Sequence, residues 1–172
     1  MVRDGGLISS STTSAEGAAG EVTVEAGRLL IDGAGSRRPT GIISRAATSA
    51  SGSVGQGDAG GVRVQAGTIE MVDGGSVSSS ADGRGRAGDV VILATDRLIA
   101  ANASITTSSQ TGGGGEIRLQ VGDVIDLQDS EISTSVGGGA DPTAGNILID
   151  PKALVIAAAG SRPSRPPASA AR

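Results

Sequence analysis

The side chains that could do chemistry in this 172-residue chain are carboxylates, hydroxyls and cationic groups, because it contains no His and no Cys. Without those two residue types, the usual zinc ligand sets and nucleophile–base pairs are missing. Hydrolysis or cleavage of a polysaccharide would need paired carboxylates, or a metal with a basic residue, on one outer face. The acidic candidates are Asp32, Asp73, Asp89, Asp96, Glu116, Asp123, Asp126, Asp129 and Glu131.

Most of these acids lie at turns or beside glycines, where aspartate favours local hydrogen bonds to the backbone. Asp123, Asp126, Asp129 and Glu131 fall within nine residues, but no adjacent part of the sequence carries a matching cluster. We interpret them as solvated turn and surface residues. The prediction is therefore a protein that is not an enzyme, with no catalytic, cofactor-binding or metal-binding residues and no cofactor; a binding site stays unassigned.

The composition limits the kind of core that the chain can build. There are 29 Gly and no Phe, Tyr or Trp, so the interior must come from small aliphatic side chains. The net charge of −4 gives no reason to expect a nucleic-acid partner. No stretch approaches the roughly 18–20 apolar residues of a membrane span, and the first residues lack the apolar core of a signal peptide. The length suggests one domain.

One sequence unit is repeated five times. A small residue and a glycine precede alternating aliphatic positions in AGEVTV, AGGVRV, AGDVVI, GGEIRL and AGNILI, which begin at residues 19, 59, 87, 114 and 144. The spacings are 40, 28, 27 and 30 residues. Alternation of this kind predicts half-buried strands. The predicted inward pairs are Val22/Val24, Val62/Val64, Val90/Ile92, Ile117/Leu119 and Ile147/Ile149, and Arg63 and Arg118 are expected to share an outward column.

Each unit contains two further strand candidates. The second holds Leu29/Ile31, Ile69/Met71 and Leu154/Ile156, while Leu98 and Ile125/Leu127 are displaced by one residue, which predicts a turn of different length there. The third holds Ile8, Ile43, Val77, Ile105 and Ile132 and is followed by Ser or Thr, which could form hydroxyl ladders. Gly74, Asn102 or Asp129 precedes it, and these residue types tolerate positive φ.

Two segments depart from the repeat. Residues 33–58 account for the longest spacing and are expected to project as a loop insertion. Residues 159–172 are rich in Pro and Arg and are predicted to form a disordered tail. The predicted domain is a repeat segment over residues 1–158.

Repeats of this length indicate a solenoid. Three short strands in each unit of 27–30 residues, joined by tight turns, predict an all-β parallel β-helix of about five coils, one of them longer. A propeller would need about four strands per repeat. The glycine-rich stretches at 55–61 and 137–145 only approach the GGxGxD pattern of calcium-binding β-rolls.

The successive stretches LLIDGAGSRRPTGIISRA, AGTIEMVDGGSVSSS, ATDRLIAANASITTSS, VGDVIDLQDSEISTS and AGNILIDPKALVI resemble the repeats of filamentous-haemagglutinin-type adhesins of two-partner secretion. The resemblance covers residues 5–156. It implies a right-handed parallel β-helix, a secreted or outer-membrane surface location, an outer-membrane transporter as export partner, and adhesion to host or neighbouring cells. The sequence shows neither the signal nor the secretion domain of that family, and its last repeat runs into the Pro/Arg tail, as expected for a fragment of a longer shaft or for a broken reading frame.

The expected function is thus a structural shaft segment of a bacterial adhesin. The alternative is a carbohydrate-binding or polysaccharide-degrading β-helix, against which the absence of aromatic side chains for stacking on sugars argues. Uncapped terminal coils would leave strand edges open, so self-association through the coil ends is also expected.

Overall fold

The computed structural model describes residues 1–13, 16–48, 55–138 and 143–158, and the predicted tail at 159–172 lies outside them. The described residues contain strands and turns and no helix. All strands pair in parallel in two sheets, which confirms the all-β prediction. The six-stranded sheet, in the order β1-β3-β5-β7-β9-β11, contains β1 (Val2–Arg3), β3 (Val22–Asp32), β5 (Val62–Val72), β7 (Val90–Ala101), β9 (Ile117–Gln128) and β11 (Ile147–Ala157). The five-stranded sheet, in the order β10-β8-β6-β4-β2, contains β2 (Leu7–Thr12), β4 (Thr40–Ala46), β6 (Gly75–Ala81), β8 (Ser104–Ser109) and β10 (Glu131–Val136).

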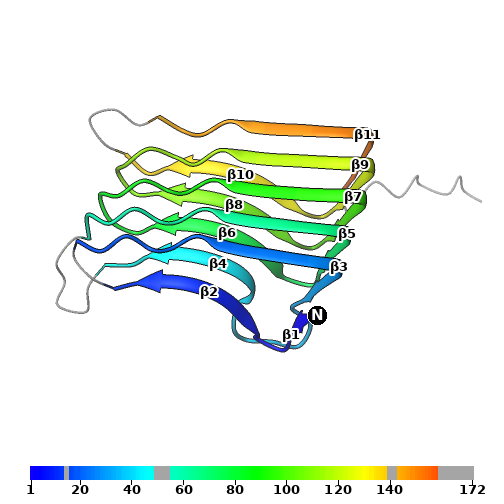
Figure 1. Cartoon of the computed structure of the whole chain (residues 1–172), viewed down its shortest axis with the longest axis horizontal. Coiled ribbons are helices and arrows are strands. Elements are labelled where there is room, and N and C mark those ends of the chain that lie inside the picture. The colour runs from blue at the N-terminus through cyan, green and yellow to red at the C-terminus, as the bar shows by residue number, and fades with distance from the viewer. Residues whose placement is uncertain (14–15, 49–54, 139–142, 159–172) are drawn as a thin grey trace, which may run out of the picture.

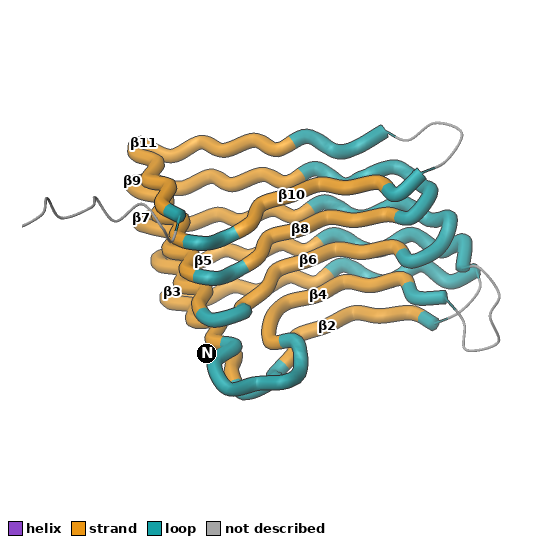
Figure 2. Tube along the Cα trace, turned by 180° about the vertical axis from the view of Figure 1, so that it is seen from behind, coloured by secondary structure: helices purple, strands orange, loops and turns teal. Residues whose placement is uncertain are grey.

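The chain alternates between the two sheets and adds one layer each time. A long strand is followed by a turn and a short strand, and the next long strand then pairs with the previous one. Figure 1 shows the long strands stacked from β3 to β11, and Figure 2 shows the short strands stacked in the same order from behind. Each layer therefore corresponds to one sequence repeat.

A third line of hydrogen bonds joins the layers between the two sheets. Residues leading into each long strand bond to their equivalents one layer on: Ala59 N donates to Arg86 O (2.9 Å), and Val62 N donates to Asp89 O (2.8 Å). The same two bonds recur at Ala87 and Val90, with distances of 3.0 and 2.8 Å. These segments are too sparsely bonded to count as strands, yet they stack in register.

The predicted first and second strands of each repeat are one continuous strand rather than two. We expected glycines such as Gly67 to end the first strand, but pairing with the neighbouring layers continues on both sides of them. The predicted one-residue displacement is confirmed: Gly67 of β5 lies opposite both Thr95 and Asp96 of β7. This bulge keeps Leu98 in register with Ile69 and directed inward.

The interior is made of aliphatic columns, as predicted. Val64, Ile92 and Leu119 stack in consecutive layers and are fully buried. Aliphatic side chains about 4.8 Å apart along a column fill the space without aromatic rings. Other fully or almost fully buried members are Ile31, Ile42, Val62, Ile69, Met71, Val77, Val90, Leu98, Ala100, Ile105, Ile117 and Ile125.

Two predictions about the first complete layer are wrong. Ile42, not Ile43, is the inward residue, because Ile42 pairs with Ile8 and Val77 whereas Ile43 pairs with Ser78. Residues 33–58 are also not one projecting loop, since β4 lies within them and pairs with β2 and β6. The extra length is divided between the turn at 33–39 and the segment after β4, of which residues 49–54 are outside the described chain.

Candidate interaction surfaces

Stacked glycines form the side of the molecule that leads into the long strands. Gly60, Gly88, Gly115 and Gly145 each lie against the carbonyl of the glycine one layer before. A Cβ atom built on Gly88 would lie 2.3 Å from Gly60 O, and one on Gly145 would lie 1.8 Å from Gly115 O. Real Cβ atoms do not approach a backbone atom this closely, so a side chain at these positions would force the layers apart.

Buried hydroxyls connect this glycine column to the short strands. Ser79 Oγ donates to Gly60 O (3.0 Å) and accepts from Gly88 N (2.9 Å). Thr107 and Thr134 occupy the same register and donate to Gly115 O and Gly145 O, both at 2.9 Å. The donor and acceptor of Ser79 are therefore used by backbone groups across the interior, and the predicted hydroxyl ladder does not form there.

Replacing Ser79 with alanine is expected to destabilise the fold by about 2 kcal/mol, because it removes the partner of Gly60 O and of Gly88 N in a partly buried position. Ser78→Ala, at the neighbouring half-buried and outward position, should cost less than about 0.5 kcal/mol. Urea unfolding of both variants measures the difference. Equal stabilities would show that the hydroxyl bridge contributes nothing.

Several acidic candidates make separate contacts with groups close to them. Asp32 Oδ1 accepts from Ala34 N (2.9 Å), and Asp89 Oδ1 accepts from Glu116 N (2.7 Å). Glu116 lies 3.4 Å from the Arg118 guanidinium, and Asp73 adopts a positive φ in the turn before β6. Asp96 lies in the bulge of β7. These carboxylates organise turns and neighbouring strands.

The four acids between residues 123 and 131 belong to three different segments. Asp123 and Asp126 lie on β9, Asp129 is in the turn, and Glu131 begins β10. Lys152 Nζ donates a hydrogen bond to Asp123 Oδ1 (2.9 Å). This bond and the lysine charge lower the pKa of Asp123, and the same bond and the carboxylate charge raise the pKa of Lys152. Among the described residues, no group of three or more carboxylates could hold a metal ion.

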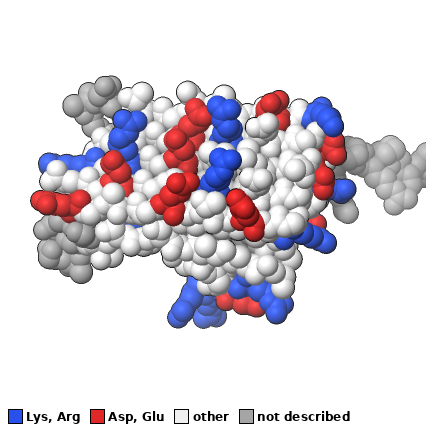
Figure 3. All heavy atoms as spheres, viewed as in Figure 1, with Lys and Arg blue, Asp and Glu red and all other residues white. Residues whose placement is uncertain are grey.

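The outer face of the long-strand sheet carries charges of both signs. Arg63 and Arg118 share one outward column with Val91 between them, as predicted. Arg28 Nη2 contacts both carboxylate oxygens of Glu70, at 2.9 and 2.8 Å. Figure 3 shows positive and negative side chains alternating across this face. Such mixed exposed charges keep a surface soluble and each pair stabilises it little.

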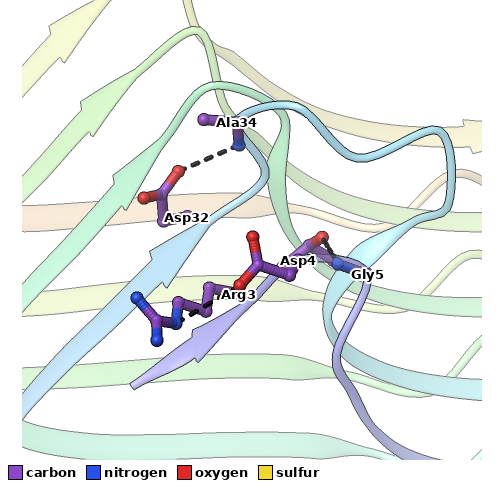
Figure 4. A network of polar contacts seen from close by, with 6 residues as sticks. Arg3, Asp4, Gly5, Asp32 and Ala34 are labelled. Carbon is purple, nitrogen blue, oxygen red and sulfur yellow. Dashed lines mark hydrogen bonds and ion pairs between the residues drawn. The ribbon is translucent and has the colours of Figure 1, made fainter.

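The corners between long and short strands are tight turns with positive φ, as predicted for Gly74, Asn102 and Asp129. The corner at the first layer uses Asp4 and Gly5 in the same way, with φ of 57° and 79°. Figure 4 shows the Asp32–Ala34 hydrogen bond of the next corner close to the pair between Arg3 and Asp4, whose Nε and Oδ2 atoms are 3.3 Å apart.

Two open grooves follow the columns, and sequence reasoning did not find either. The first, which we call the bend groove, has a volume of about 480 Å³ and lies along the bend of the long strands. The second, of about 490 Å³, follows the glycine column beside Asp58, Arg63, Arg86 and Asp89. The bend groove is lined by Gln65, Leu93, Ala94, Thr95, Gln120, Val121, Gly122, Asp150, Pro151 and Lys152. The repeat gave a signal for the bend groove, because Gln65, Leu93, Gln120 and Asp150 occupy one outward column.

The arrangement presents outward side chains of successive layers in stacked columns. Within the described part of the chain, no helix is long and apolar enough to cross a membrane. No family model, curated protein or solved structure matches the chain.

Proposed function

We propose that this chain is a segment of a right-handed parallel β-helix, and that it serves as a non-enzymatic shaft of a secreted or surface-attached bacterial adhesin. The right-handed assignment rests on the crossover rule for parallel strands of one sheet. The hydrogen bonds between the segments that lead into the long strands support closure of each layer on its third side.

The observation that carries the proposal is the contrast between interior and exterior positions. Interior columns hold the same chemistry in each layer: aliphatic side chains, a hydroxyl and a glycine. The outward column beside them changes freely, from Thr23 to Arg63, Val91, Arg118 and Leu148. A shaft requires uniform stacking in its interior and places few restrictions on its surface residues. The constant interior columns and the variable outward column match both requirements.

The location and partners belong to the same proposal. The parent adhesin would be exported by an outer-membrane transporter and would contact host or neighbouring cells. The test is whether antibodies raised against residues 1–158 label intact bacteria or detect the protein in culture supernatant. Deleting the gene should lower attachment to host or neighbouring cells several-fold. Labelling only after cell lysis, with unchanged attachment, would overturn the proposal.

The bend groove favours carbohydrate binding as a second candidate function. The groove presents Gln65 and Gln120, whose amides can donate and accept hydrogen bonds, beside the apolar Leu93 and Val121. Binding on a glycan array that Gln120→Ala removes, and that the outward Arg118→Ala keeps, would support this function. Product formation from a polysaccharide would favour degradation instead.

A further inference from the structure

Large apolar side chains are exposed at the two ends of the stack. In the inner layers, Val64, Ile92 and Leu119 are fully buried, whereas Ile149, in the same column on β11, is 37% exposed. The exposed large apolar residues of the described chain are Met1, Leu7, Ile8, Ile147, Leu148, Ile149, Leu154, Val155 and Ile156. All of them lie in the first or the last layer.

The two end layers contain different parts of one coil. The first consists of β2 and of the short β1, which pairs only with Ile31 and Asp32 of β3. Among the described residues, the edge of β3 from Val22 to Leu30 therefore has no strand beside it. The last layer consists of β11, and the outer edge of β10 is open within the described chain. One end holds the short strand, and the other holds the long strand.

We propose that copies of this chain associate head to tail, so that β11 of one copy and β2 of the next complete a shared coil. β11 then pairs with the open edge of β3 in the second copy, and β2 of that copy pairs with β10. Extending the existing registers places Ile147 beside Val22, Leu154 beside Leu29, and Ile132 beside Ile8. This association does not depend on an adhesive role for the protein.

The chemistry of each column continues through this contact. The aliphatic columns meet aliphatic residues, and Thr134 comes next to Ser10. Gly20 of the second copy lies against the carbonyl of Gly145 of the first. Each glycine of the column lies in the same way against the carbonyl of the glycine one layer before it. Ile156 occupies the same register position as Val2, so the last two residues of β11 must turn aside from β1.

The geometry selects a parallel second copy as the occupant. Turning the second copy end over end would reverse its strands or exchange its two sheets. In either case one of the two ladders would lose its partner, because long and short strands occupy different sides of the layer. The proposed contact continues the stacking direction of the strands, so successive copies extend along one axis instead of closing into a ring, and they build linear filaments.

Gly20→Ala separates association from folding. Within one copy, a Cβ at Gly20 meets only the Ser10 hydroxyl, at 3.1 Å. A small shift of that hydroxyl relieves the contact and at most weakens one exposed hydrogen bond, from Gly20 N to Ser10 Oγ (2.9 Å). In the proposed contact the same Cβ would meet Gly145 O of the neighbouring copy. We expect wild-type mass measured by light scattering to rise with concentration, and Gly20→Ala to weaken association about tenfold or more with its melting temperature nearly unchanged.

The matched control is Gly61→Ala in the interior of the stack. Its Cβ would have ordinary contacts, 3.4 Å from Asp89 O, and should change neither folding nor association. A wild-type chain that stays monomeric at high concentration would overturn the proposal. Association that Gly20→Ala leaves unchanged would overturn it as well.

A cysteine pair tests the register. Ser9 and Ser133 occupy equivalent outward positions in β2 and β10, four strand spacings or about 19 Å apart within one copy. In the proposed contact they become neighbours at about 4.8 Å, within the range of a disulfide. Oxidised Ser9→Cys/Ser133→Cys should give a ladder of covalent oligomers, and Ser11→Cys/Ser133→Cys should not. The opposite result would overturn the register.

One substitution should strengthen the contact. Asp150 would lie opposite Glu25 of the next copy, and like charges directly opposite each other weaken a sheet. Glu25 is exposed and pairs with the uncharged Gln65 in its own copy, so Glu25→Lys should have little effect on folding. We expect it to tighten association about two- to fivefold at low salt. Weaker association would contradict this pairing.

Discussion

Replacing Gly88 with alanine is expected to destabilise the chain by roughly 3 kcal/mol or more, because the added methyl group has no space between two paired layers. The new Cβ would lie 2.3 Å from Gly60 O and 2.4 Å from Gly60 C, which are backbone atoms held by pairing on both sides. Relief requires two layers to separate, which also breaks the hydrogen bond from Gly88 N to Ser79 Oγ. Thermal and urea unfolding followed by circular dichroism measure the loss.

Gly61→Ala is the matched control for this change. It adds the same methyl group one residue along and one layer away, at a distance of 3.4 Å from Asp89 O. We expect its unfolding free energy to stay within about 0.5 kcal/mol of wild type. If Gly88→Ala were equally well tolerated, the stacked glycines would not determine the spacing of the layers.

Ile92→Ala is expected to cost between about 2 and 5 kcal/mol, because it opens a cavity in a fully buried column between Val64 and Leu119. Those neighbours are fixed by strand pairing and cannot collapse into the space. Val91→Ala, on the outward side of the same strand, should cost under about 1 kcal/mol because Val91 is only half buried. Similar losses for both variants would mean that the inward and outward assignment is wrong.

Much of the fold could be predicted from the period of the sequence repeat and from the alternation of apolar and polar residues. The inward positions of the first strand are correct in β5, β7 and β9, because a two-residue alternation fixes which side faces the core. The predicted inward pair Ile147/Ile149 continues the same columns, but both residues are exposed in the last layer. The displacement at Leu98 is also correct, since only an extra residue before it keeps it buried. The main error was to predict two strands where the structure has one long strand, because glycine was interpreted only as a residue that ends strands. In a parallel stack, an extended glycine such as Gly67 continues the pairing while the strand bends.

The error at Ile43 has a different origin. TGIISRA offers two adjacent isoleucines, and alternation alone does not choose between them. The choice depends on pairing between layers, which places Ile42 beside Ile8 and Val77. A signal was present, however. In the other short strands a hydroxyl residue follows the inward aliphatic by two positions, as in Val77 and Ser79, and Ser44 selects Ile42 by the same rule.

The surfaces were harder to predict than the core. The bend groove is lined by residues of four separate repeats, so no single stretch of sequence contains it. The link between Ser79 and Gly88 crosses the interior between two elements nine residues apart. It could have been found by noting that the hydroxyl and the glycine occur once in each repeat.

The hydrogen bonds between layers run along the stacking direction, so the structure responds to pulling in an unusual way. A force applied along the stack breaks the hydrogen bonds between one pair of layers at a time. Each layer adds about 4.8 Å to the folded height but contains about 28 residues, as between Ala59 and Ala87, which extend to nearly 100 Å. Releasing one coil therefore lengthens the chain about twentyfold relative to the height it occupied. Under load such a stack dissipates mechanical energy by unfolding one layer at a time, while its remaining layers stay folded.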